Sequence, residues 1–232
     1  MEKLIVALDV ANANLAKKII EQLGDEVTFY KLGLELMMSG EYFEVVKFLK
    51  AKNKKIFADL KLYDISQTMM RAVENLKKYQ IDILTIHSAS YDIMRSVAKI
   101  KGEIKVVAVT VLTNLDSNDL VQMGFDDKNS LEELVKNKTK MTLESGLDGV
   151  VASANEAKIL RQNFGNNFLI ITPGIRLQQV ANDDQKRTAS VVEAIENGAS
   201  HLVVGRPILQ DQDIKASAIK FINAINEASK NS

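Results

Sequence analysis

Residues 55–65 read Lys55-Ile56-Phe57-Ala58-Asp59-Leu60-Lys61-Leu62-Tyr63-Asp64-Ile65, so that an apolar run passes directly into charged side chains. Side chains alternate across a β-strand, and therefore Asp59 and Lys61 share one face while Ala58 and Leu60 share the other. We expect the Ala58/Leu60 face to pack against helices. The Asp59/Lys61 face must then point inward, where charges are costly unless they are paired or used. Asp64 follows just past this strand.

Seven further apolar runs lie on either side of this strand. Together they give eight predicted strands: Leu4–Leu8, Val27–Leu32, Lys55–Leu60, Ile83–Ile86, Ile104–Val111, Gly149–Ala152, Phe168–Ile171 and His201–Val204. Continuous apolar runs are typical of parallel strands that are covered on both faces. Helical periodicity between the runs predicts helices over Ala13–Leu23, Glu41–Lys50, Gln67–Tyr79 and Ile214–Ala228. This alternation predicts an α/β fold, and eight repeats favour a closed (β/α)8 TIM barrel over an open sheet.

Length and composition are compatible with one domain that spans residues 1–232. The chain has 232 residues, of which 46% are hydrophobic, and no stretch resembles a flexible linker. Its 30 basic and 30 acidic side chains cancel, which argues against a nucleic-acid or anionic-membrane partner. With no cysteine, it cannot use disulfides, thiolate catalysis or Cys-based zinc sites. No run approaches the roughly 20 apolar residues of a membrane helix, so we expect a soluble, cytoplasmic protein.

Polar and glycine residues gather at the carboxyl ends of the predicted strands. In addition to the residues of the third strand, they are Asp9, Lys31, His87, Thr113, Pro173, Gly174, Arg176, Gly205 and Arg206. Barrel enzymes build their active sites at this end of the barrel. The alternative is an internal ion-pair cluster that only closes the barrel, since such networks resemble sites. Scattered surface charges would not all fall at one end of the barrel. We therefore favour an active site over a purely structural ion-pair cluster.

The loops after the seventh and eighth strands have features of a phosphate site. Barrels frequently bind phosphate there. Gly205 allows close approach of the backbone, and Arg176 and Arg206 offer forked, permanently charged donors. The polar, aperiodic segment at about residues 174–189 is predicted to be a lid over this site, the alternative being a variable surface loop.

The two histidines do not indicate a metal centre. A lone strand-end histidine such as His87 is more often hydrogen-bonded and structural than catalytic. His201 opens the last strand, at the opposite end of the barrel, and is interpreted as structural. Neither has a His or Cys partner at metal-ligand spacing. We therefore expect no metal site.

The run from Asp59 to Ile65 resembles the Asp-x-Lys-x-x-Asp-Ile signature of the orotidine 5′-monophosphate (OMP) decarboxylases. The likeness continues along the whole chain, in Leu8-Asp9, Lys31-Leu32-Gly33, Val109-Thr110-Val111-Leu112-Thr113, Thr172-Pro173-Gly174-Ile175-Arg176, Asp183-Asp184-Gln185-Lys186-Arg187 and Val203-Val204-Gly205-Arg206-Pro207-Ile208. The Asp-x-Lys-x-x-Asp piece is shared with relatives of other activity, but the combination is specific. Ser66 stands where the family commonly has proline, and serine can cap the following helix.

This resemblance implies a cofactor-free enzyme that decarboxylates OMP to UMP, the last step of de novo pyrimidine nucleotide biosynthesis. It implies that Lys61 protonates C6 of the pyrimidine and that the catalytic set is Lys31, Asp59, Lys61 and Asp64. The implied substrate-binding residues are Asp9, Lys31, Asp59, Ile65, Thr68, Thr113, Pro173, Arg176, Gln185, Gly205 and Arg206. It also implies a homodimer in which Asp64, Ile65 and Thr68 reach the neighbouring subunit's site.

Two other functions compete with this one. A magnesium-dependent sugar-phosphate decarboxylase or aldolase-type relative would carry an acidic metal ligand at the end of the second strand. Lys31 stands there instead, and an ammonium cannot bind a divalent cation. A catalytically silent, phosphate-binding barrel that acts as a regulator is the second alternative. The intact set of Lys31, Asp59, Lys61 and Asp64 argues against it.

Overall fold

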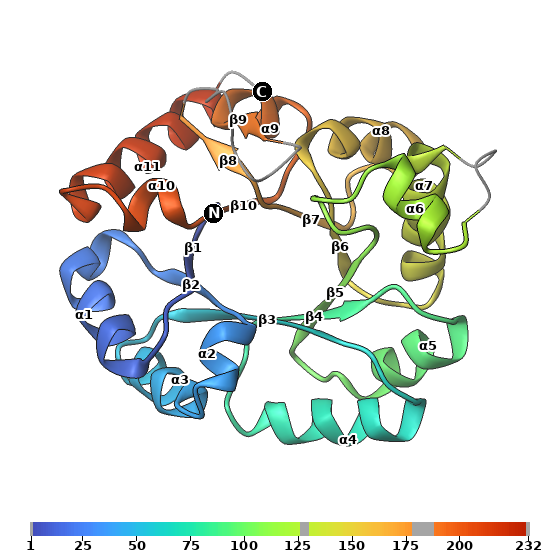
Figure 1. Ribbon diagram of the computed structural model, residues 1–232, viewed down its shortest axis with the longest axis horizontal. Helices are drawn as coiled ribbons and strands as arrows, with labels where there is room; N and C mark the ends of the chain where they lie inside the picture. Colours follow the sequence, from blue (N-terminus) through green and yellow to red (C-terminus); the bar gives the residue numbers. More distant parts are fainter. Residues whose placement is uncertain (1, 126–129, 178–187, 231–232) are drawn as a thin grey trace.

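The computed structural model describes residues 2–125, 130–177 and 188–230, and its centre is a closed barrel of parallel strands (Figure 1). The barrel strands are β1 (Leu4–Leu8), β2 (Phe29–Leu32), β3 (Lys55–Leu62), β4 (Ile83–His87), β5 (Lys105–Val109), β6 (Gly149–Val151), β7 (Leu169–Thr172) and β10 (His201–Val204). Each pairs with the next along the chain, and β1 pairs with β10 to close the ring. The predicted (β/α)8 barrel is therefore confirmed.

All eight predicted strands occur, with shifts at their ends. β2 begins at Phe29 rather than Val27, β5 is confined to Lys105–Val109, and β3 runs on to Leu62. A strand ends where its neighbour no longer offers hydrogen-bonding groups in register, which an apolar pattern does not reveal. The extension of β3 is associated with a shift in its register against β4 between Ala58 and Leu62.

Helices surround the barrel (Figure 1). They are α1 (Ala13–Leu23), η1 (Gly24–Glu26), α2 (Leu34–Met38), α3 (Tyr42–Ala51), α4 (Ser66–Lys77), α5 (Tyr91–Ile100), α6 (Ser117–Gln122), α7 (Leu131–Glu144), α8 (Ala154–Phe164), α9 (Val191–Glu196), α10 (Arg206–Leu209) and α11 (Ile214–Lys230). The four predicted helices correspond to α1, α3, α4 and α11. None of the described helices is long and apolar enough to cross a membrane.

The start of α4 differs in one detail from the expectation for Ser66. The sequence predicted a helix from Gln67 with Ser66 able to cap it, but α4 begins at Ser66, Ile65 occupies its N-cap, and none of the described side chains caps it. Ser66 is thus the first helical residue and not a cap. This is the position that proline favours elsewhere, because its amide needs no partner inside the helix.

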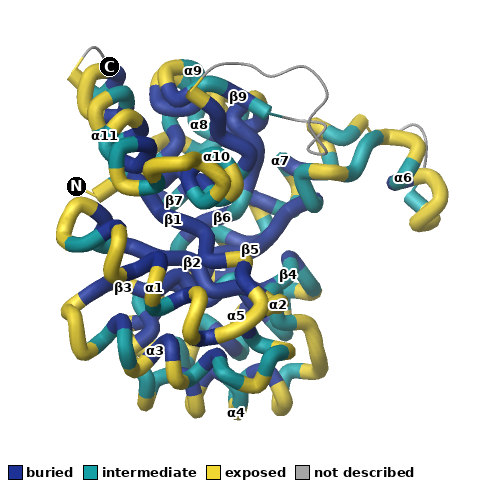
Figure 2. Tube along the Cα trace, turned by 60° about the vertical axis from the view of Figure 1, so that its left-hand side comes forward, coloured by how far each residue is buried: buried dark blue, intermediate teal, exposed yellow. Residues whose placement is uncertain are grey.

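Two apolar layers hold the fold together. One fills the barrel with residues from most of its strands: Ile5, Ala7, Phe29, Phe57, Ile83, Val107, Ile171 and Val203. The larger layer lies between the strands and the helices, and it includes both Ala58 and Leu60. The expectation for that face of β3 is confirmed. Figure 2 shows the result, with the strands buried and the exposed positions on the outer helices.

The segment after β7 is less irregular than the sequence suggests. Its two ends form a short parallel pair, β8 (Ile175–Arg176) with β9 (Ala189–Ser190), and the Ala189 amide donates to the Gly174 carbonyl at 3.2 Å. The prediction of an aperiodic loop over residues 174–189 is therefore wrong at both ends. The reason is that two residues are enough for a parallel pair when tertiary contacts hold them side by side. Residues 178–187 of the predicted lid, including Gln185, lie outside the described residues.

Gly149 at the start of β6 provides a test of barrel packing. A Cβ added there would lie 2.1 Å from the Leu169 carbonyl oxygen, a backbone atom that cannot move without breaking the β6–β7 pairing. We expect Gly149→Ala to lower the free energy of unfolding by roughly 3 kcal/mol, the upper end of the range for overpacking. Urea denaturation followed by circular dichroism measures the change.

Gly40→Ala is the matched control. Gly40 directly follows the C-cap residue of α2, its φ of 82° lies in the left-handed region, and its added Cβ would meet no described atom within 4 Å. The expected loss is about 1 kcal/mol, from backbone conformation alone. Equal losses in the two variants would show that the close approach at Gly149 does not limit the barrel.

Candidate active site

A cavity of about 230 Å³ opens at the carboxyl ends of the barrel strands. Ten of the residues predicted from the sequence line it: Asp9, Lys31, Asp59, Lys61, Thr113, Pro173, Gly174, Arg176, Gly205 and Arg206. They come from loops and strands far apart in the chain, which the barrel brings to one mouth. Asp64, Ile65 and Thr68 do not line this cavity.

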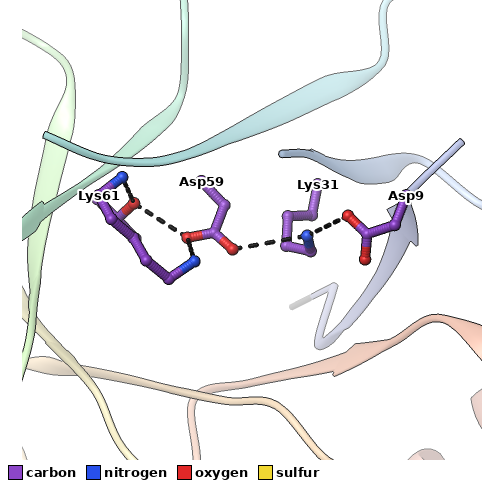
Figure 3. Close-up of polar contacts among 5 residues, drawn as sticks. Asp9, Lys31, Asp59 and Lys61 are labelled. Atoms are coloured by element: carbon purple, nitrogen blue, oxygen red, sulfur yellow. Dashed lines mark hydrogen bonds and ion pairs between the residues drawn. The ribbon is translucent and has the colours of Figure 1, made fainter. Parts of the chain in front are cut away.

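A row of four alternating charges crosses one side of the cavity (Figure 3). The Lys31 ammonium donates to Asp9 Oδ1 at 2.7 Å and lies 3.5 Å from Asp59 Oδ2. The Lys61 ammonium donates to the other oxygen, Asp59 Oδ1, at 2.8 Å. The Asp59 carboxylate therefore bridges the two ammoniums, with one oxygen facing each of them.

The electrostatics keep this carboxylate ionised. Asp59 side-chain exposure is only 13%, and burial by itself would raise the pKa of the carboxyl. The Lys31 and Lys61 ammoniums outweigh this effect, together with hydrogen bonds from Lys61 and Thr85, and the pKa stays below its ordinary value. Asp59 is therefore an anion at neutral pH, between the two lysine side chains.

Lys61 has an unusual backbone. Its φ is 47°, which is a left-handed conformation that costs a non-glycine residue about 1–3 kcal/mol. The conformation falls where β3 slips in register against β4. Its amide donates to the Thr85 hydroxyl at 2.8 Å, and that hydroxyl donates to Asp59 Oδ1 at 3.0 Å. A strained backbone persists only where surrounding contacts stabilise it. The hydrogen bond from the Lys61 amide to the Thr85 hydroxyl is such a contact, and we therefore count Thr85 as part of the candidate site.

Two residues of the site, Thr85 and Gly33, were not predicted from the sequence. Thr85 is a polar residue between the apolar Leu84 and Ile86 of β4, and this interruption is a signal that could have revealed it. A Cβ at Gly33 would lie 3.0 Å from Asp9 Oδ1 and 3.2 Å from Lys31 Nζ. Glycine at this place lets the two charged groups meet.

The far side of the cavity is different in character. Apolar side chains from β5, β6, β7 and β10 form it: Val109, Val151, Ile171 and Val203. The charged residues Asp9, Lys31, Asp59 and Lys61 belong to β1, β2 and β3 or directly follow them. The cavity therefore places a charged wall against an apolar one.

Two arginines reach the cavity from its β7–β10 side, where a phosphate site was predicted. Arg176 lies on β8, is buried, and donates from Nη1 to the Ile175 carbonyl at 2.9 Å. Arg206 is exposed at the start of α10, next to Gly205, which is the N-cap residue of that helix. Both arginines therefore line the same cavity.

The residues of the β3–α4 connection do not line the cavity of their own chain. Asp64 Oδ1 accepts the Ile65 amide at 2.7 Å, while Ile65 and Tyr63 are each 69% exposed. Thr68, on the first turn of α4, is exposed as well. The structure thus brings Lys31, Asp59 and Lys61 together, but leaves Asp64 outside their row.

The histidines lie apart from this chemistry. His87 ends β4 with its ring edge-to-face with Tyr63, at 5.8 Å between ring centroids. Burial, Lys138 and Lys61 lower the pKa of His87. His201 is at the opposite barrel end, packed on Phe29, and burial lowers its pKa to about 4. Both imidazoles are neutral at neutral pH, in agreement with a structural interpretation.

No group of three or more His, Cys, Asp or Glu side chains among the described residues is arranged to hold a metal ion. In the charged row, each carboxylate is engaged by at least one ammonium. The donor groups of the cavity therefore suit an anionic, polar ligand.

Comparisons with known proteins agree with this geometry. A curated relative from Methylococcus capsulatus, "Orotidine 5′-phosphate decarboxylase", is 44% identical over 94% of this chain and 89% of its own length. One of the same name from Nitrobacter winogradskyi is 43% identical over 98% of this chain and 94% of its own. The crystal structure of orotidine 5′-phosphate decarboxylase from Lactobacillus acidophilus superposes with a TM-score of 0.85 at 34% identity, covering 97% of this chain and 100% of that one.

A family model extends the match to nearly the whole chain. It carries the description "Orotidine 5′-phosphate decarboxylase / HUMPS family" and matches residues 2–221. That range contains every strand of the barrel and every residue that lines the cavity. The chain belongs to the orotidine 5′-phosphate decarboxylase / HUMPS family.

Proposed function

We propose that this protein decarboxylates OMP to UMP, the last step of de novo pyrimidine nucleotide biosynthesis. The observation that carries the proposal is the row Asp9–Lys31–Asp59–Lys61, with an ammonium at the end of β2. A relative that used a divalent cation would need an oxygen ligand at that place. The Lys31 ammonium has no lone pair to offer, so within this family the row favours the decarboxylase. A cytoplasmic location agrees with a chain that has no cysteine.

The proposed chemistry uses the enzyme's own ammonium and no cofactor. The bond between C6 and the carboxylate carbon breaks, CO2 leaves, and the electron pair stays on C6. Lys61 stabilises the developing negative charge and then transfers a proton to C6, which gives UMP and a neutral amine. Water returns the proton to Lys61. The Asp59 contact at 2.8 Å holds the ammonium in place before substrate binds.

The remaining residues of the cavity are assigned to binding. Asp59 is assigned to face the departing carboxylate. Lys31 is assigned to contact both Asp59 and the ribose. The apolar wall from β5 to β10 accepts CO2, which is uncharged, more readily than it accepts the carboxylate. Ribose and pyrimidine groups are assigned to Asp9 and Thr113. Phosphate is assigned to the opposite edge of the cavity, with Pro173, Arg176, Gln185, Gly205 and Arg206.

We also propose that the working unit is a homodimer whose sites are shared. Asp64 is outside the cavity of its own chain, and its neighbours Tyr63 and Ile65 are largely exposed. Met38 at the end of α2, 77% exposed, is a further large apolar residue open to solvent. Exposed apolar residues next to an active-site mouth favour contact with a second copy. In this arrangement Asp64, Ile65 and Thr68 complete the partner's site.

The proposed reaction is tested by ultraviolet assay of OMP loss. The wild-type protein is expected to convert OMP, and Lys61→Ala to lower kcat by at least about 100-fold, because general acid catalysis alone contributes about 10²–10⁴-fold. Lys136→Ala is the control, since Lys136 pairs with Glu132 on the surface of α7 at 3.2 Å. The control should retain wild-type activity.

Exhaustive treatment with EDTA, in the same assay, distinguishes metal-independent decarboxylation from the chemistry of a magnesium-dependent relative. Activity on OMP should survive it. Loss with EDTA and recovery with magnesium would contradict the proposal, as would a Lys61→Ala variant with substantial activity.

The phosphate assignment is tested with a substrate that lacks phosphate. Charged hydrogen bonds contribute about 1.5–3 kcal/mol each, so Arg206→Ala is expected to lower kcat/KM for OMP about 10- to 150-fold. The same variant should act on the nucleoside orotidine about as well as the wild type does. Parallel losses on both substrates would mean that Arg206 supports the fold and does not hold phosphate.

Mixed dimers test the shared site. Lys61→Ala and Asp64→Ala should each be nearly inactive alone. After subunit exchange, one site of each mixed dimer receives both lesions and the other receives neither. Random pairing makes half of the dimers mixed, so about a quarter of wild-type activity should return. Sites built within one chain cannot be rescued in this way, and no recovery despite demonstrated exchange would refute the shared site.

A further inference from the structure

Thr85 is a fully buried residue of β4 whose hydroxyl joins the Asp59 carboxylate to the backbone of Lys61, the last two residues of the charged row. It accepts a hydrogen bond from the Lys61 backbone amide at 2.8 Å and donates one to Asp59 Oδ1 at 3.0 Å. The Lys61 ammonium returns to that same Asp59 oxygen at 2.8 Å. The backbone of Lys61, the hydroxyl, the carboxylate and the ammonium therefore form a closed ring of hydrogen bonds.

The ring accounts for the left-handed backbone of Lys61. Between Ala58 and Leu62 the register of β3 against β4 shifts, so the regular ladder is interrupted at Lys61. The Thr85 hydroxyl supplies the acceptor for the Lys61 amide at this place. A hydroxyl has one proton, and since its oxygen receives the amide, that proton is directed to Asp59. Without the Thr85 hydroxyl, the Lys61 amide would lose this hydrogen-bond partner. The strained backbone conformation of Lys61 would then lose its support.

Nothing in the packing requires a polar residue at this position. The neighbouring residues of β4, Ile83, Leu84 and Ile86, are all apolar and buried. Valine has nearly the shape of threonine and would satisfy the packing equally well. What distinguishes threonine is the hydroxyl, and both partners of that hydroxyl are residues of the charged row.

We propose that Thr85 is a positioning residue for decarboxylation, which sets the Lys61 ammonium and the Asp59 carboxylate relative to each other through its hydroxyl. This inference rests on the proposed function of Lys61. Thr85 does not line the cavity, so in this proposal it acts through its two partners and not on the substrate. Its effect should therefore fall on the chemical step, since the groups assigned to phosphate and ribose belong to other strands or to the segments that follow them.

Two pairs of variants isolate the hydroxyl. Thr85 and Thr85→Val differ in the hydroxyl at nearly constant shape, and Thr85→Ser and Thr85→Ala differ in the hydroxyl when the methyl group is already absent. In each pair, loss of the hydroxyl should lower kcat for OMP about 10- to 100-fold, as expected for a lost hydrogen bond to a charged group, with KM changed by about twofold or less. Thr85→Ser should remain close to the wild type.

Thr139→Val is the matched control for removing a buried threonine hydroxyl. Thr139 lies on α7, is fully buried, and its hydroxyl has no hydrogen-bond partner. Its kcat should equal that of the wild type. Unchanged kcat in both hydroxyl-free variants of Thr85, or a rise in KM alone, would overturn the proposal.

Hydrogen exchange at the Lys61 amide provides a readout that needs no activity. The amide should exchange faster in Thr85→Val and Thr85→Ala than in the wild type and Thr85→Ser. Unchanged protection would overturn the proposal even if kcat fell. If the wild-type protein failed to decarboxylate OMP, the proposed function would fail, whereas the exchange comparison would still decide whether Thr85 holds the Lys61 backbone.

Discussion

The Asp59 carboxylate, which two lysine ammoniums share, is the contact on which the arrangement of the barrel mouth depends. Its oxygens lie 3.5 Å from Lys31 Nζ and 2.8 Å from Lys61 Nζ, so one buried anion separates two cations that would otherwise repel each other. Asp9 adds a second anion beyond Lys31. Removing the central charge would leave two poorly solvated ammoniums without compensation, which is the costly way to break a buried ion pair.

The strands that carry this row are supported in two different ways. On the outside of the barrel, Ala58 and Leu60 pack in the layer beneath the helices. On the inside, Phe57 belongs to the apolar cluster below the cavity. The charged groups are therefore set on strands whose positions are decided by dense apolar packing, and the cost of ordering those groups is met when the protein folds and not when substrate binds.

The two walls of the cavity differ in polarity, so the candidate site has a charged side and an apolar side. Ammoniums and carboxylates occupy the side formed by β1 to β3, while Val109, Val151, Ile171 and Val203 face them from the strands that complete the barrel. Arg176 and Arg206 line the same cavity from its β7–β10 side. A substrate that carries charge at one end and loses charge at the other suits such a cavity, because the apolar wall disfavours the charged reactant more than the neutral product.

Much of the fold and of the cavity lining could be predicted from the amino-acid sequence alone. Eight apolar runs, their alternation with helices, and the residues at the ends of most runs were enough to predict the barrel, the end at which its cavity opens, and ten of the residues that line the cavity. Side-chain alternation and helical period are local properties, and a sequence therefore displays them directly. The left-handed backbone of Lys61, the ring through Thr85 and the short pair of β8 with β9 could not be predicted in this way. Each depends on the register between segments distant in the chain, and register is decided only when packing and hydrogen bonding across the closed barrel are satisfied together.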